Sequence, residues 1–183
     1  MRGISTMQLT WLKLLLTLCL LPLAVRASDS AFNGRWRMDT TRSTALDGWT
    51  TADLVIQNDG SGVTLRHDMT WHTTKVTATN QVNTAQPTDI TNFFRIDQRH
   101  MAVYARPKEA AKVQAAWIDN GRTLRIEAHV PVETSQGNTT MRIYQEYRLL
   151  DGGNDLVLIE LHSTRDRPLA YHFTRVPAEA AKN

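Results

Sequence analysis

The histidines are the residues of this sequence best suited to acid-base or metal chemistry. There are six of them. His72, His129 and His162 fall on the polar side of alternating segments, so we expect them to be solvated. His67 shares the apolar side of its segment and is expected to point inward. Three roles fit it: a core histidine bonded to a neighbouring strand, a polar anchor for a ligand, or a metal ligand. The last is least favoured, because no His, Asp or Glu lies two residues away on that side.

Several other polar side chains fall among apolar ones. Buried amides and phenols need hydrogen-bond partners, which a ligand, trapped water or one another can supply. A cavity with a few convergent polar groups on an aromatic wall is typical of small-molecule sites. The alternative is a filled interior in which these groups pair with each other. The candidate lining residues are His67, Trp71, Trp117, Gln145, Tyr147 and Tyr171.

The sequence offers little for covalent or cofactor-dependent catalysis. Its single cysteine is Cys19, which precedes the expected globular part, so thiol catalysis and cysteine-ligated zinc are not expected there. The sequence contains no Gly-x-Ser-x-Gly elbow and no Gly-rich phosphate loop. Acidic residues on polar sides lie beside arginines, which favours cross-strand charge pairing; these are Asp68, Glu127, Glu146 and Glu160. We therefore expect no catalytic residue, no metal ligand and no cofactor.

Apolar and polar residues alternate through residues 50–176, which predicts antiparallel β-strands. Residues that favour turns separate the segments at 58–62, 119–121 and 151–154, so successive strands should form hairpins. The expected inward sets are Val63, Leu65, His67, Met69 and Trp71; Val76, Ala78, Asn80 and Val82; Leu124, Ile126, Ala128 and Val130; Met141, Ile143, Gln145, Tyr147 and Leu149; Val157, Ile159 and Leu161; and Leu169, Tyr171 and Phe173.

About ten such segments, each with one apolar side and no helix to cover it, must close on themselves. The sequence therefore predicts an all-β, antiparallel up-and-down β-barrel of about 8–10 strands over residues 28–176. A two-sheet sandwich is the alternative. The pattern is weakest over residues 83–112, where Phe94 with Ile96 and Met101 with Val103 are the expected strand positions.

Residues 1–27 have the three parts of a secretory signal peptide: a basic start, an apolar run and small residues at the cleavage site. The run is too short for a membrane anchor, since a span needs about 20 apolar residues. We expect cleavage after Ala27, a periplasmic or secreted mature chain without a transmembrane segment, and a C-terminal tail at 177–183.

The charge of the chain is concentrated in its first residues. The sequence has 21 basic and 18 acidic residues, but Arg2, Lys13 and Arg26 all lie in residues 1–27, which contain no acid. The rest of the chain is formally neutral, with both signs interspersed. Nucleic-acid binding depends on a basic stripe, so no nucleic-acid partner is expected.

Two short motifs at opposite ends of the chain resemble those of one superfamily. Gly34-Arg35-Trp36 opens the first expected strand, and Arg175 lies near the end of the last. The pairing resembles the calycins, the lipocalins and their relatives, in which such an Arg stacks over the Trp. The stretches 117–124 and 147–152, Trp-Ile-Asp-Asn-Gly-Arg-Thr-Leu and Tyr-Arg-Leu-Leu-Asp-Gly, are similar to bacterial exported lipocalin-like domains.

The resemblance covers residues 32–176 and implies a barrel closed at one end by Gly34, Trp36 and Arg175. The Thr-Asp-Tyr motif and the disulfide of the lipocalins are missing from the sequence, so no ligand identity follows from it.

These observations favour a non-catalytic protein that binds a small hydrophobic or amphipathic molecule inside a barrel. Such a protein should have an interior cavity of at least roughly 300 Å³. One alternative is a cell-envelope module with a filled barrel, which binds a protein partner through loops or through an apolar outer face at Leu156 and Leu158. The other is an enzyme that uses the barrel as a reaction chamber, with His67 as its base.

Overall fold

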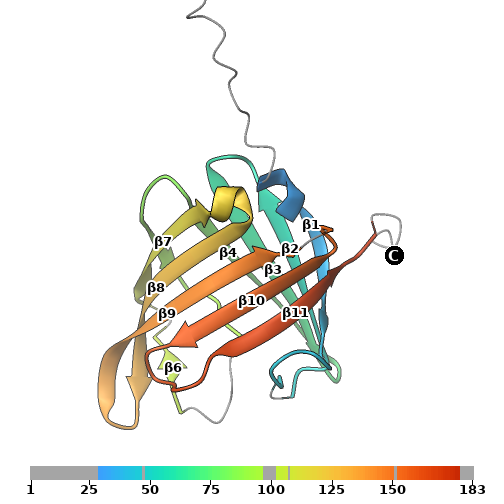
Figure 1. Cartoon of the computed structure of the whole chain (residues 1–183). Helices are drawn as coiled ribbons and strands as arrows, with labels where there is room; N and C mark the ends of the chain where they lie inside the picture. Colours follow the sequence, from blue (N-terminus) through green and yellow to red (C-terminus); the bar gives the residue numbers. More distant parts are fainter. Residues whose placement is uncertain (1–28, 47, 97–101, 107, 151, 178–183) are drawn as a thin grey trace, which may run out of the picture.

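The computed structural model describes residues 29–46, 48–96, 102–106, 108–150 and 152–177. These residues form one antiparallel sheet of eleven strands that curls into a nearly closed barrel (Figure 1). The strands are β1 (Gly34–Asp39), β2 (Thr51–Asn58), β3 (Gly62–Trp71), β4 (Thr74–Asn83), β5 (Thr88–Thr91), β6 (Tyr104–Ala105), β7 (Ala110–Ile118), β8 (Thr123–Thr134), β9 (Gly137–Leu149), β10 (Asp155–His162) and β11 (Leu169–Arg175). The all-β barrel that the alternation predicts is thereby confirmed.

Most strands pair with their neighbours in the sequence, and the first strand, β1, also pairs with the last, β11. The strand order runs β4-β3-β2-β1-β11-β10-β9-β8-β7-β5, and β6 pairs with the far end of β8. Because β1 pairs with both β2 and β11, the first and last strands lie side by side. No ladder joins the described residues of β4 and β5. The barrel therefore has one seam, between these two strands.

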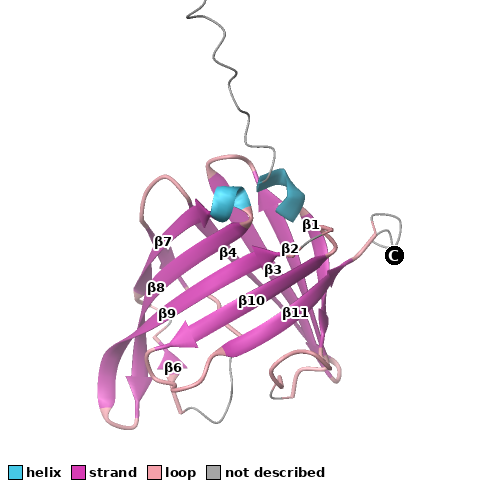
Figure 2. Cartoon of the chain, viewed as in Figure 1, coloured by secondary structure: helices cyan, strands magenta, loops and turns pink. Residues whose placement is uncertain are grey.

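Two 3-10 helices, η1 (Asp29–Phe32) and η3 (Asp119–Gly121), lie at the same end of the barrel (Figure 2). Within the described ranges, no helix is long and apolar enough to span a membrane. The expected signal peptide, residues 1–27, and most of the expected tail lie outside the described residues.

Burial alternates along most strands as the sequence predicts. In β3, Val63, Leu65, His67 and Met69 are buried and the residues between them are not. The same pattern occurs in β8 and β11 and at residues 141–147 of β9, where residue 146 is also buried. One face of the sheet thus forms a continuous core, because side chains in a strand point alternately to opposite faces.

The parity predicted for β10 is wrong. Leu156, Leu158, Glu160 and His162 are buried, whereas Leu161 is 44% exposed. Both faces of this strand are apolar at its start, so composition cannot select the inner one. The neighbouring strands select it, because directly opposed residues project to the same side. Glu160 lies opposite Gln145 of β9 and Leu169 of β11, and both of these point inward.

Residues 92–96 form no strand and instead pack against the inner wall of the barrel. Phe93, Arg95 and Ile96 are buried, and the ring of Phe94 lies 4.8 Å from that of His67. The side chain of Asn80 in β4 fixes the segment. Its Nδ2 donates to the Phe94 carbonyl, and its Oδ1 accepts from the Phe94 N–H, both at 2.8 Å. The strand expected at Phe94 and Ile96 is therefore absent, and Met101 lies outside the described residues.

Replacing Asn80 by Ala is expected to lower the free energy of unfolding by about 2–4 kcal/mol, because it leaves two backbone groups of Phe94 without partners. Asn80 is 1% exposed, so water cannot readily replace the amide. Urea titration measures the effect. Gln81→Ala, at the exposed neighbouring position, should change stability by less than about 0.5 kcal/mol. Equal effects of the two substitutions would show that Asn80 does not hold the segment.

The end of the barrel near η1 is closed by a stacked Trp and Arg. The guanidinium of Arg175 lies 4.1 Å from the centroid of the Trp36 ring, which is the contact that the calycin resemblance implies. Arg175 also donates to the carbonyl oxygens of Asn33 and Gly153 at 2.8 and 3.0 Å, and to that of Ala31. Gly34 has φ +134°, and a Cβ there would lie 3.1 Å from Arg175 Nη1. A residue with a side chain at this position would be strained and would crowd the guanidinium.

Candidate functional site

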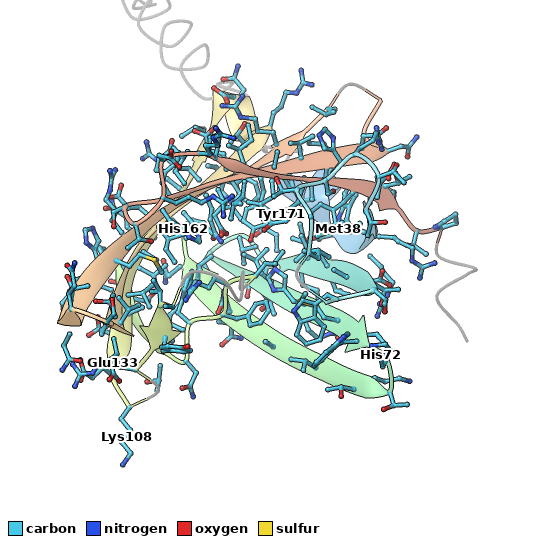
Figure 3. All side chains as sticks on the ribbon, turned by 90° about the horizontal axis from the view of Figure 1, so that it is seen from below. Met38, His72, Lys108, Glu133, His162 and Tyr171 are labelled. Carbon is cyan, nitrogen blue, oxygen red and sulfur yellow. The ribbon has the colours of Figure 1, made fainter. Side chains whose placement is uncertain are left out.

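Four of the six candidate lining residues lie in the interior of the barrel. His67, Gln145, Tyr147 and Tyr171 have exposed fractions between 0 and 4%. Gln145 and Tyr147 are neighbours on the inner face of β9, and Tyr171 lies opposite Leu158, the β10 partner of Tyr147. His67 comes from β3, on another part of the wall. Seen from the end opposite η1, Tyr171 and His162 lie within the barrel and His72 and Glu133 at its rim (Figure 3).

The other two candidates lie at the ends of the barrel. The ring of Trp117 meets that of Phe32 edge-on at 4.9 Å, beneath η1. Its Nε1 is buried and has no hydrogen-bond partner among the described residues. Trp71, the last residue of β3, packs against Gly48, whose Cβ would lie 3.3 Å from the indole Nε1. The structure therefore groups only His67, Gln145, Tyr147 and Tyr171.

A buried carboxyl group, missed by the sequence analysis, lies at the centre of this group. Glu160 is 0% exposed. Its Oε2 accepts a hydrogen bond of 2.5 Å from Nε2 of Gln145, and its Oε1 lies 2.5 Å from Nε2 of His162. His162 is likewise buried. The expectation that both residues face solvent is thus wrong, for the same reason as the parity of β10. In the sequence, the only sign of this site is that Glu160 and His162 are two residues apart and so lie on the same face of β10.

The inner polar cluster, defined as Gln145, Glu160 and His162, is incompletely paired. Oε1 of Gln145 is buried and has no hydrogen-bond partner among the described residues, and the same holds for Nδ1 of His67, which is not part of the cluster. Buried polar atoms without partners are costly. The arrangement therefore offers at least one open acceptor, the Gln145 oxygen, and one imidazole nitrogen to an incoming polar group.

Burial changes the proton affinities of the groups around the cluster. Desolvation lowers the pKa of His67 to about 4, although Glu160 and Asp68 oppose this shift. Desolvation also raises the pKa of Tyr147, and the charge of Glu160 adds to this shift. Both side chains are consequently neutral near pH 7. His67 is then a hydrogen-bonding group without charge.

The depressed pKa of His67 predicts a loss of stability in acid. The unfolded chain takes up a proton near pH 6.5 and the folded chain only near pH 4. Stability should therefore fall as the pH drops through this window, by about 3 kcal/mol in total. Urea titrations across the window, with the wild type and His67→Leu, test this prediction. The Leu variant should lack this part of the pH dependence, whereas His72→Leu at an exposed position should retain it. Parallel pH profiles of wild type and His67→Leu would contradict the assignment.

The outer face carries charge pairs at three of the four acids for which the sequence predicts them, Asp68, Glu127 and Glu146, whereas Glu160 is buried inside. Arg35 bridges Asp53 and Asp68 at 2.9 and 3.0 Å. Arg142 pairs with Glu127 at 2.7 Å. These groups lie on the side of the sheet opposite the inner polar cluster and stabilise the wall from outside. Within the described ranges, no group of three or more His, Cys, Asp or Glu side chains is arranged to hold a metal ion.

Several pockets lie among the described residues, and one of them is lined by His162 of the inner polar cluster. One of about 190 Å³ lies beside residues 92–96 and is lined by Phe94, Arg95 and Val130 among others. Others, of about 350 and 440 Å³, lie at the outer surface near Leu161 and near Asp68. The expected interior cavity is not among these pockets. The pocket beside 92–96 leads toward the inner wall, because Phe94 also contacts His67.

Known proteins share the architecture of this chain but little of its sequence. No protein-family model matches it, and no curated protein does. Apo lipid binding protein 8 of Caenorhabditis elegans is 8% identical, covers 80% of this chain and 96% of its own, and has a TM-score of 0.52. A secretory abundant heat soluble (SAHS) protein of Ramazzottius varieornatus is 12% identical, with coverages of 80% and 96% and a TM-score of 0.51.

The chain shares the β-barrel fold of these two proteins. This agrees with the resemblance that rests on Trp36 and Arg175. At such low identities the likeness concerns the fold alone.

Proposed function

We propose that this protein binds a small hydrophobic or amphipathic molecule inside its barrel without chemically changing it. The observation that carries the proposal is the inner polar cluster: three buried polar side chains in the barrel interior, with an open acceptor at Gln145. Small-molecule sites are built in this way. The similar structure from C. elegans is named for lipid binding, which supports the same class of ligand.

The ligand reaches the interior past residues 92–96. This segment lies near the seam between β4 and β5, where no ladder has to open. It is held by the two hydrogen bonds of Asn80 and by the contact of Phe94 with His67. Outward movement of the Phe94 ring would join the 190 Å³ pocket to the space beside His67.

We infer a non-catalytic role because His67, the base considered for a reaction chamber, is a weak one. With a pKa of about 4 it is a poor proton acceptor at neutral pH. Glu160 is already bonded through both of its oxygens. The cluster can orient a polar group but offers no activated nucleophile.

Native mass spectrometry of the protein, purified from the cells that make it, tests the proposal. A bound small molecule in about equal amount, released and identified by solvent extraction, is expected. Gln145→Leu should lower the affinity for that molecule about tenfold, as loss of one buried hydrogen bond predicts. Gln114→Leu, at an exposed position of β7, is the matched control. A clean apo mass under these conditions would count against binding.

The second candidate is a filled barrel that binds another protein. It is favoured by the packing of residues 92–96 against the inner wall and by the outer face of β10, where Val157 and Ile159 are half-buried and Leu161 is exposed. The face proposed from the sequence, Leu156 and Leu158, is buried inside. An apo mass together with a co-purifying protein would support this candidate.

The N-terminal residues have the composition of an export signal. We propose that residues 1–27 are a signal peptide and that the mature chain acts in the periplasm or outside the cell. The basic start, apolar run and small residues before Ser28 support this. N-terminal sequencing of the native protein should begin at Ser28, and an intact N-terminus at Met1 would contradict the proposal.

A further inference from the structure

The buried charges of the protein are unevenly placed with respect to the barrel interior. Asp53 and Glu146 face outward and pair with Arg35 and Arg148. Arg95 donates to the carbonyl of Val103 at 3.0 Å and lines the pocket beside residues 92–96. The remaining buried ionisable groups on the inner wall include an acid, Glu160, and two imidazoles, His67 and His162.

Among the described residues, Glu160 forms its ion pair with a histidine and not with an arginine or lysine. The partners of Glu160 are a neutral amide and a histidine. The guanidinium of Arg175 is bonded to carbonyl oxygens at the closed end and stacked on Trp36. The pair of Glu160 and His162 therefore combines one acid with a histidine and includes no arginine or lysine.

The orientation of Gln145 follows from this carboxylate. An ionised carboxylate only accepts hydrogen bonds, so the amide must present its Nε2 to Glu160. Its Oε1 therefore faces away from Glu160, and it is buried with no partner among the described residues. An acceptor beside an acid suits a group that donates a hydrogen bond. It does not suit a carboxylate, which would bring a second negative charge into a low-dielectric interior.

We propose that the barrel selects amphipathic molecules whose polar group donates hydrogen bonds and has no negative charge, such as an alcohol, an amide or an amine, and rejects the corresponding carboxylate. This inference rests on the proposed function, because it requires a ligand inside the barrel. The polar group donates to Oε1 of Gln145 and lies near Glu160, and the apolar chain extends along the inner wall toward Phe94.

Competition with three probes of one chain length tests the inference. Dodecanol, dodecylamine and dodecanoic acid displace the neutral dye Nile red at about pH 8, where the acid is ionised. The alcohol and the amine are expected to bind at least about tenfold more tightly than the acid. Glu160→Gln removes the charge at nearly constant shape and should reduce this preference to less than about threefold. Glu127→Gln, which removes a carboxylate from the outer face, should leave the preference unchanged.

The outcomes separate the two proposals. If neither the dye nor any probe binds, both the proposed function and this inference fail. If the probes bind and the acid binds as tightly as the alcohol, only the inference fails. The same holds if a folded Glu160→Gln keeps the full preference. Should Glu160→Gln not fold, Gln145→Leu takes its place: it should weaken the alcohol about tenfold and the acid little, and equal weakening of both would overturn the inference.

Discussion

Replacement of His162 by Leu is expected to lower the free energy of unfolding by about 3–5 kcal/mol at neutral pH. The side chains of His162 and Glu160 are 3% and 0% exposed and lie 2.5 Å apart. Without the imidazole, the carboxyl group stays buried with only the Gln145 amide as partner. Urea titration of the wild type and the variant measures the difference.

The chain contains its own control for this prediction. His129 lies two residues from Glu127 on the outer face of β8, at 3.4 Å, and these side chains are 50% and 33% exposed. This pair has the same sequence spacing but is in contact with water, so His129→Leu should cost less than about 1 kcal/mol. If His129→Leu and His162→Leu were equally destabilising, burial of Glu160 would not be the cause.

The double variant Glu160→Leu/His162→Leu should recover most of the lost stability. Replacing a buried ion pair by apolar residues of similar size is often neutral or stabilising. Comparison with both single variants gives the coupling of the two side chains. A stable double variant that no longer binds the ligand would indicate that the pair serves binding more than folding. A double variant less stable than His162→Leu would contradict this prediction.

Replacement of Trp36 by Ala is expected to destabilise the protein by about 3–5 kcal/mol, as for other fully buried aromatic residues. Trp36 is 0% exposed, and its Nε1 donates to the Phe32 carbonyl at 2.9 Å. The change leaves a cavity at the closed end, removes the ring beneath Arg175 and releases η1. Thermal and urea unfolding measure the loss.

Trp36→Phe separates the contributions at the closed end. Phe keeps an aromatic ring for Arg175 but cannot donate to Phe32, so we expect a loss of about 1–2 kcal/mol. Equal losses for Ala and Phe would show that the hydrogen bond to Phe32, and not the ring, holds the closed end together.

Much of the fold could be predicted from the sequence because most strands have one apolar side. The alternation of residue types identifies the inner face of a strand from the sequence alone, as at Leu65, His67 and Met69 in β3 or at Gln145 and Tyr147 in β9. Trp36 and Arg175 predict the closed end, because their types and their positions at the two ends of the chain fit one stacked contact. The inward placement of His67, Gln145, Tyr147 and Tyr171 follows from the same alternation, whereas their role in binding stays a prediction.

Only the tertiary structure decided which side of β10 faces inward and where residues 92–96 lie. Both sides of β10 are apolar, so the sequence pattern does not identify the inner side. The register with β9 and β11 places Glu160 and His162 inside. At residues 92–96, the hydrogen bonds of Asn80 take the place of a strand partner, and a side-chain contact of this kind leaves no periodicity in the sequence. The sequence by itself thus determined the barrel and most of its inner wall. Strand register, which depends on residues far apart in the sequence, placed Glu160 and His162 in the interior of the barrel.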